Sequence, residues 1–90
     1  MKLIDTPYST IAAVDDTGAE YIAIPVFEDS EIVVYRLPSG GATDIKGVLY
    51  LPDDAKLLST HDMDDCRDAD AAYEKCERLL LGLKEGGGGK

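Results

Sequence analysis

The amino-acid sequence predicts an α+β domain: a small antiparallel β-sheet of three to five strands in a meander, with one C-terminal amphipathic α-helix packed on one face. Short β-branched and aromatic segments separated by turn residues come first, and a helical apolar periodicity appears only near the C-terminus. Strands followed by a helix are typical of α+β rather than α/β folds. With 90 residues, one domain over 1–85 is expected, followed by a flexible glycine-rich tail at 86–90.

Two strands are expected around the first turn. Residues 8–14 form a short apolar run, and residues 21–27 form a longer run in which alternate side chains share a face. Residues 15–18 (Asp-Asp-Thr-Gly) separate them, and these residue types favour turns because Asp bonds its own backbone and Gly permits a positive φ. Pro25 lacks a backbone N–H, so the second strand is expected at a sheet edge or with a bulge there.

Residues 32–37 (Ile-Val-Val-Tyr-Arg-Leu) are the strongest strand in the sequence. Their β-branched and aromatic side chains fit a pleated surface. Both faces of this strand are largely apolar, which indicates a central strand or one covered on both faces. Because a polar turn occupies residues 28–31, segment 20–37 is predicted to be a β-hairpin.

Further β-structure is expected before the helix. A loop rich in Gly, Ser and Pro spans 38–44, and a strand is predicted at 45–51, where Gly47 suggests a bulge or a close backbone approach. Turn residues at 52–54 end that strand. Residues 56–60 form either a last short strand or the entry to the helix.

The C-terminal segment has the spacing of an amphipathic helix. Apolar residues recur at intervals of three and four, which indicates a buried stripe; they are Cys66, Ala69, Tyr73, Cys76, Leu80 and Leu83. Asp62 or Asp64 is the expected N-cap, because a carboxylate there accepts bonds from free helical N–H groups. On such a helix the two cysteines would lie roughly 15 Å apart, too far for a disulfide, so both are expected as reduced core residues.

Charge is the main global property of the chain. Eighteen Asp and Glu residues against nine Lys and Arg give a net charge of −9. This balance disfavours direct binding to nucleic acid or to an anionic membrane, both of which attract basic surfaces, and it favours a basic protein partner. Asp5 stands where a signal peptide needs apolar residues, and no apolar run approaches a membrane span, so a cytoplasmic location is expected.

Segment 61–68 is the most suggestive for function, because it combines dense acids with the only histidine. The acid-rich start of the predicted helix is expected to bind the basic partner, through Asp62, Asp64, Asp65, Asp68, Asp70, Glu74 and Glu77. The alternative is a small metal-dependent domain or enzyme centred on His61, Asp62, Asp64 and Asp65, since carboxylates suit divalent cations. The segment departs from a calcium loop, because Cys66 and Arg67 replace an oxygen ligand and the glycine.

Catalytic motifs are lacking in the sequence. It contains no nucleophile elbow, no Cys-x-x-Cys pair and no P-loop, and its single histidine limits general-base chemistry. A non-catalytic interaction protein without a cofactor is therefore expected, acting on a nucleic-acid-binding partner.

Small acidic inhibitors from phages and mobile elements, such as anti-restriction and anti-CRISPR proteins, are similar to this chain in size and charge. That similarity is one of composition, and it suggests a mimic of nucleic acid. The chain is expected to be a monomer or, if the helical stripe pairs with its copy, a homodimer.

Overall fold

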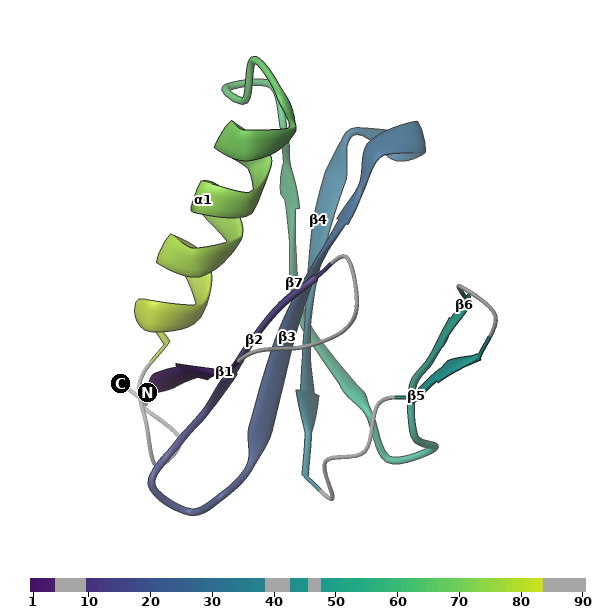
Figure 1. Ribbon diagram of the computed structural model, residues 1–90, viewed down its shortest axis with the longest axis vertical. Helices are drawn as coiled ribbons and strands as arrows, with labels where there is room; N and C mark the ends of the chain where they lie inside the picture. Colours follow the sequence, from purple (N-terminus) through teal and green to yellow (C-terminus); the bar gives the residue numbers. More distant parts are fainter. Residues whose placement is uncertain (5–9, 39–42, 46–47, 84–90) are drawn as a thin grey trace.

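The computed structural model describes residues 1–4, 10–38, 43–45 and 48–83. The elements in chain order are β1 (Lys2–Ile4), β2 (Ile11–Val14), β3 (Glu20–Val26), the 3-10 helix η1 (Phe27–Asp29), β4 (Glu31–Leu37), β5 (Thr43–Ile45), β6 (Val48–Tyr50), β7 (Lys56–Asp62) and α1 (Ala69–Leu81). Five strands form one antiparallel sheet in the order β1-β2-β3-β4-β7, and α1 packs on one face of it (Figure 1). The predicted α+β class is confirmed, whereas the predicted tail lies outside the described residues.

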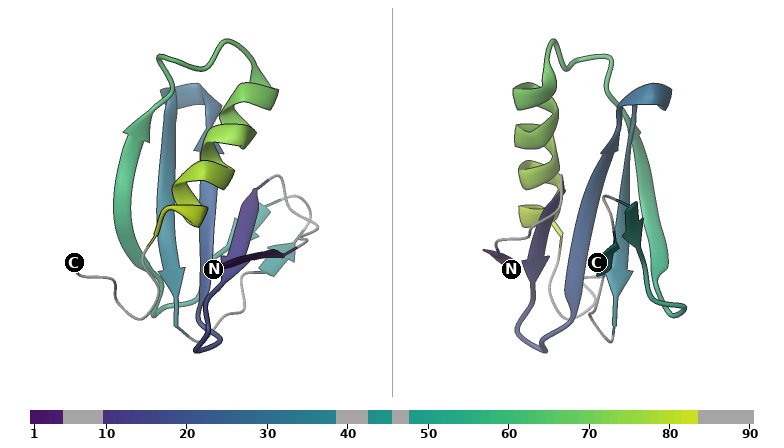
Figure 2. Two further views of the ribbon diagram at one scale, coloured as in Figure 1. Left: turned by 90° about the vertical axis from the view of Figure 1, so that its left-hand side faces the viewer. Right: turned by 45° about the vertical axis from the view of Figure 1, so that its right-hand side comes forward.

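The expected strand at 45–51 is wrong, because this segment contributes to two strands. β5 and β6 pair antiparallel with each other as a separate two-stranded sheet, with Ile45 opposite Val48. Gly47, the expected bulge, lies outside the described residues. The hairpin is inserted between β4 and β7, so residues 56–62 return as a strand beside β4. In Figure 2 the hairpin lies on the side of the main sheet opposite α1.

The predicted 20–37 hairpin is confirmed as β3 and β4, joined by η1 and by Ser30 in the left-handed region (φ 54°). The expectation for Pro25 needs a correction. β3 is an interior strand with β2 and β4 on its two sides, and its ladder shows no bulge at Pro25. However, β2 pairs with β3 only as far as Ala23, so Pro25 lies beyond the end of β2. A missing N–H is tolerated there because one side of the strand has no β2 partner.

Two strands at the start of the chain differ from expectation. β1 was not predicted from the sequence, because three residues are too few to show a periodicity. It pairs with β2, which places Lys2 opposite Val14. β2 occupies only the second half of the expected 8–14 strand, and residues 8 and 9 lie outside the described part of the chain.

The core lies on both faces of the sheet, as the alternation of side chains along a strand requires. On the α1 side, the sheet residues Ala13, Tyr21, Ala23, Ile32 and Val34 pack with Ala72, Cys76 and Leu80 of the helix. On the opposite side, Ala12, Ile22 and Leu37 pack with Leu49, Leu51 and Ala55 from the segment around β6. β4 is thus an interior strand that contributes to both cores, which confirms the interpretation of its two apolar faces.

The helix begins later than predicted. Asp68 has an extended backbone (φ −157°) and its carboxylate accepts a bond of 2.9 Å from the Ala71 N–H, so Asp68 is the N-cap. Asp62 ends β7, and its carboxylate instead accepts a bond from the Asp64 N–H at 3.2 Å. Asp side chains compete with helices by bonding nearby backbone, which is why the acid-rich segment forms turns rather than a first helical turn. Cys66 therefore lies before the helix.

Candidate functional site

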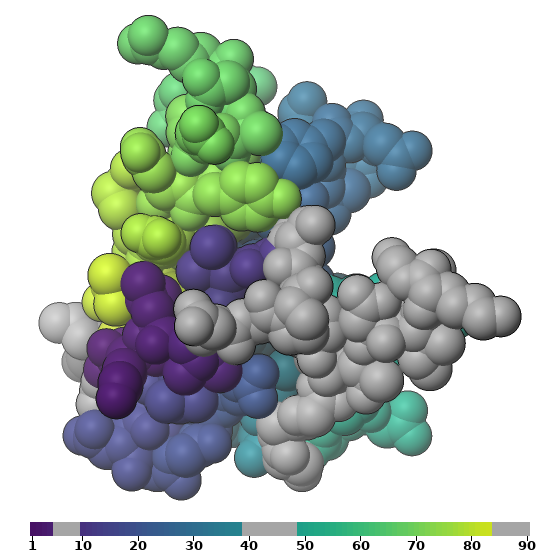
Figure 3. Space-filling model, in the orientation of Figure 1, coloured from purple at the N-terminus to yellow at the C-terminus, as the bar shows by residue number. Residues whose placement is uncertain are grey.

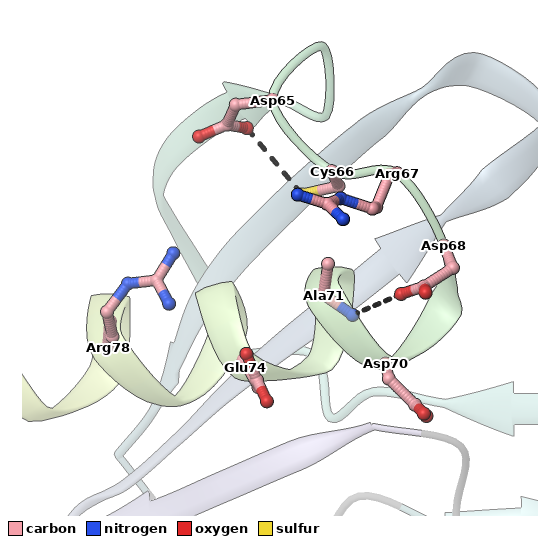
Figure 4. A pocket seen from close by; sticks show the side chains of 8 residues that line it. All are labelled: Asp65, Cys66, Arg67, Asp68, Asp70, Ala71, Glu74 and Arg78. Atoms are coloured by element: carbon pink, nitrogen blue, oxygen red, sulfur yellow. Dashed lines mark hydrogen bonds between the residues drawn. The ribbon is translucent and has the colours of Figure 1, made fainter.

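The site begins at the connection between β7 and α1, where residues 63–68 fold over the start of the helix. A cavity of about 380 Å³ opens between this connection and α1, along the helix as far as Arg78 (Figure 4). It is lined by Asp65, Cys66, Arg67, Asp68, Asp70, Ala71, Glu74 and Arg78. The connection is held to the helix by the Asp68 cap and by bonds from Lys75.

The structure brings four of the seven predicted partner-binding residues to this cavity, namely Asp65, Asp68, Asp70 and Glu74. The other three are Asp62 at the end of β7, Asp64 in the connection, and Glu77 further along α1, and none of them lines it. All seven side chains are on exposed residues.

Lys75 is the residue near this site that the sequence interpretation missed. Its Nζ donates to the Asp65 carboxylate at 2.9 Å and to the Asp62 backbone carbonyl at 2.8 Å, and lies 3.9 Å from the Asp62 carboxylate. Only 16% of the Lys75 side chain is exposed, against 64% for Asp65. The sequence does contain a clue to this position. Lys75 directly precedes Cys76 of the apolar stripe, so helical spacing places its cation beside that stripe.

This ion pair changes the titration of its members. The hydrogen bond from Lys75 lowers the pKa of Asp65, and the same bond raises the pKa of Lys75. Both groups are therefore charged at neutral pH, and Asp65 is already neutralised by a neighbour. The Asp65 carboxylate and the Asp62 backbone carbonyl, both bonded to Lys75, hold the connection against the helix.

The cavity also contains two guanidinium groups, from Arg67 and Arg78. In Figure 4 the carboxylates of Asp70 and Glu74 point to one side of the helix, away from both guanidinium groups. The cavity is therefore of mixed charge, and the carboxylates that remain available for a partner lie on the outer helix face. Asp70, Glu74 and Glu77 occupy that face at i, i+4 and i+7.

The histidine is separated from this cavity. His61 lies on the α1 side of β7, since it is opposite the core residue Ile32, and its Nε2 is 2.9 Å from the Ser59 hydroxyl. It lines a different cavity of about 280 Å³, together with Ser59, Arg78 and Leu83. In the described part of the chain, no three His, Cys, Asp or Glu side chains are placed to hold a metal ion. The geometry thus gives no support to a metal centre at His61, Asp62, Asp64 and Asp65.

Both cysteines are free and neither is placed as a reactive thiol. Cys76 is fully buried under the helix, and burial raises the pKa of its thiol to about 11. Burial also raises the pKa of the half-buried Cys66 thiol, which donates to the Asp65 carboxylate at 3.6 Å. The expected core role is confirmed for Cys76, and Cys66 packs against the same core from the connection.

A third cavity, of about 250 Å³, lies where the β3–β4 turn approaches the helix start. Figure 3 shows the blue turn and the green helix as neighbours on this side of the molecule. Phe27 makes an edge-to-face contact with Tyr73, with ring centroids 6.1 Å apart, and Phe27 is still 50% exposed. Met63, Arg67 and Asp68 are among the other residues that line this cavity.

Comparison of the chain with protein-family models, curated proteins and solved structures found no match. Among the described residues, no helix has the length and apolarity needed to cross a membrane.

Proposed function

We propose that this chain is a non-catalytic interaction protein that binds a basic partner through the exposed acidic face of α1. The observation that carries the proposal is the row formed by Asp70, Glu74 and Glu77. Their residues are exposed, and no ion pair joins any of them to another residue that the structure describes. Neighbouring positions in such a row are about 6 Å apart on a helix surface.

A linear array of carboxylates on a rigid helix has the charge pattern of a nucleic-acid strand. A protein whose groove selects phosphates can bind such an array, because the same Lys and Arg side chains pair with carboxylates. We therefore propose a nucleic-acid-binding protein as the partner, with this chain acting as a mimic that occupies its groove. More specifically, we propose that the chain is an inhibitor of the anti-restriction or anti-CRISPR kind, encoded by a phage or mobile element.

The fixed connection supports this assignment physically. Because Lys75 neutralises Asp65 and anchors the Asp62 carbonyl, the start of the helix is held without using the outer carboxylates. Their negative charge adds to the net charge of −9, which attracts a cationic surface over a distance of about one Debye length.

The experiment is a pull-down of the full chain from a lysate of its source cells, washed at low and at high salt, with mass spectrometry of the retained proteins. A basic nucleic-acid-binding protein held at low salt and released at high salt is the expected result, since counterion screening weakens such contacts. Absence of any basic partner at both salt concentrations contradicts the proposal.

A matched pair of variants locates the contact. Glu74→Gln with Glu77→Gln removes two charges from the row, whereas Asp16→Asn with Asp53→Asn removes two exposed charges from turns outside α1. Both variants have the same net charge, so a general effect of acidity lowers capture equally. Loss of capture only in the α1 variant is expected.

A further inference from the structure

The face of the main sheet opposite α1 is unusual, because apolar residues occupy partly exposed positions in the middle of β3 and β4; the polar positions of this face on β3, β4 and β7 are Glu20, Glu31, Thr60 and Asp62. An antiparallel sheet with one solvated face normally alternates apolar residues inward with polar residues outward. Here Ile24 and Val26 of β3 and Val33 and Tyr35 of β4 are only partly buried on the outward side. Leu57 of β7 lies directly opposite Tyr35 and is 56% exposed.

Only one end of this face is covered by the rest of the described chain. Leu37 and Ile22 are fully buried there against Leu49 and Leu51. At the other end, Val26 and Val33 join neither core cluster of the described residues. Figure 2 shows α1 along one side of the sheet and the β5–β6 hairpin beside the lower part of the other side. Ile24 and Tyr35 pack against the Leu37 cluster but stay partly exposed, and Leu57 is exposed beside Tyr35. We call the apolar surface that the described residues leave partly exposed, formed by Ile24, Val26, Val33, Tyr35 and Leu57, the open sheet face.

The open sheet face ends in a group of carboxylates. Glu31 of β4 lies directly opposite Asp62 of β7, and Val26 is its partner on β3. Like charges directly opposite each other across a sheet are destabilising. Glu28 and Asp29 are exposed in η1 at the same end. The nearest described cation, Lys75, lies 3.9 Å from the Asp62 carboxylate but is 2.9 Å from Asp65.

We propose that the open sheet face docks an amphipathic helix of a basic protein. The apolar side of that helix covers Val33, Tyr35 and Leu57, and a lysine or arginine at one end is placed between Glu31 and Asp62. From Glu31 to Tyr35 the strand runs about 13 Å, which is the length of about nine helical residues. The identity of the occupant as a basic protein rests on the proposed function, whereas the surface it uses does not.

Charge decides between this occupant and a second copy of the chain. The outward positions of β3, β4 and β7 carry Glu20, Glu31 and Asp62 and, in the described residues, no lysine or arginine. The same face of a second copy therefore offers no cation to these carboxylates, and a second copy brings a further charge of −9. A basic helix supplies both the apolar cover and the missing positive charge.

The test uses the full chain and two synthetic peptides of identical leucine and lysine composition. One peptide is ordered to form an amphipathic helix, and the other is scrambled so that leucines and lysines mix on every face. Calorimetric titration is expected to give binding about tenfold or more tighter for the amphipathic peptide, because only it presents an apolar side. Equal affinities would mean that charge alone drives binding, which overturns the proposal.

The chain offers a matched control for the contact surface. Leu57→Ser removes an exposed leucine from the open sheet face, and Leu81→Ser removes one of similar exposure (51%) from the end of α1. Thermal melts check that both variants fold. Leu57→Ser is expected to weaken binding of the amphipathic peptide by about fivefold or more, with Leu81→Ser unchanged. Equal effects of the two variants overturn the docking surface.

Three outcomes separate this inference from the proposed function. A dimer in sedimentation equilibrium that Leu57→Ser dissociates identifies a second copy as the occupant, and the inference is then wrong. Lysate capture that depends on Glu74 and Glu77 but not on Leu57 leaves the proposed function intact and also rejects docking on the open sheet face. If the Leu57→Ser variant loses capture and the variant with Glu74→Gln and Glu77→Gln does not, the docking surface is retained and the acidic helix row is rejected.

Discussion

Asp15 is the buried charged residue in the described part of the chain, and only 8% of it is exposed. Its Oδ1 accepts bonds from the Thr17 N–H at 2.9 Å, the Thr17 hydroxyl at 2.6 Å and the Ala19 N–H at 3.1 Å. Its Oδ2 accepts a bond from the Tyr21 hydroxyl at 2.9 Å. The Tyr21 oxygen in turn accepts a bond from Arg36 Nε, which joins the turn to β4. Every oxygen of this carboxylate is used, so its role is structural.

The hydrogen bonds to Asp15 predict an acid-sensitive contribution to stability. The Thr17 hydroxyl, more than any other group, lowers the pKa of Asp15 to about 2, below the ordinary value of about 3.9 in an unfolded chain. A lowered folded pKa stabilises the fold above about pH 4 and loses this contribution as pH falls towards about 2. The melting temperature of the Asp15→Asn variant is therefore expected to fall less over this pH range than that of the native chain.

The control for this measurement is Asp16→Asn, one residue along in the same turn and exposed. Its melting temperature should fall with pH as steeply as that of the native chain. A parallel acid dependence for the Asp15 variant and the native chain would show that the bonds to this carboxylate contribute no pH-dependent stability.

The two cysteines are expected to differ in reactivity. Cys76 is inaccessible, and a pKa of about 11 leaves only about one thiolate in a thousand at pH 8. Cys66 is half-buried and more accessible, although burial raises its pKa also. In a maleimide time course, Cys66 should react first and slowly, and Cys76 only after denaturant is added. Rapid labelling of Cys76 in the native chain contradicts the packing of α1.

At the scale of the element, the start of α1 depends on one side chain. Asp68→Ala removes the carboxylate that accepts the Ala71 N–H and is expected to cost about 1 kcal/mol of unfolding free energy. For a domain of this size that corresponds to a decrease of roughly 4–8 °C in melting temperature. Asp64→Ala is the control, because Asp64 precedes the cap and its residue is exposed. Equal losses in both variants would place the cap elsewhere.

The contact of α1 with the sheet depends on its buried stripe. Leu80 is fully buried, whereas its neighbour Leu81 is 51% exposed. Leu80→Asp is expected to unfold the domain, because an unpaired buried carboxylate costs several kcal/mol and total stability is only about 5–15 kcal/mol. Leu81→Asp should change the melting temperature little. Circular dichroism melts of both variants test this, and a folded Leu80 variant would mean that the stripe does not face the sheet.

At the scale of the whole molecule, the net charge of −9 acts against the compact state. Raising salt from about 0.01 M to about 0.15 M shortens the Debye length from about 30 Å to about 8 Å. The melting temperature should therefore rise with salt over this range. The variant Asp16→Asn with Asp53→Asn is expected to show a smaller rise, and a fall in the native chain would show that attractive pairs outweigh the repulsion.

The sequence by itself determined the fold class, the β3–β4 hairpin, the turn at 15–18 and the apolar side of α1. These features depend on local residue types: β-branched side chains in β4, Asp and Gly in the turn, and a period of three and four around Cys76 and Leu80. The acidic row of α1 was also identifiable, because Asp70, Glu74 and Glu77 share a face through helical spacing alone.

Only the tertiary structure decided the start of the helix, the position of Lys75 and the cover of the sheet. Asp62, Asp64 and Asp68 are equally good caps by residue type, and the return of β7 to β4 selected Asp68 by committing Asp62 to a strand. Lys75 meets Asp65 only because the connection folds back over α1. Likewise, an apolar position such as Val33 is buried or open according to which element covers it, and local periodicity carries no information about that contact.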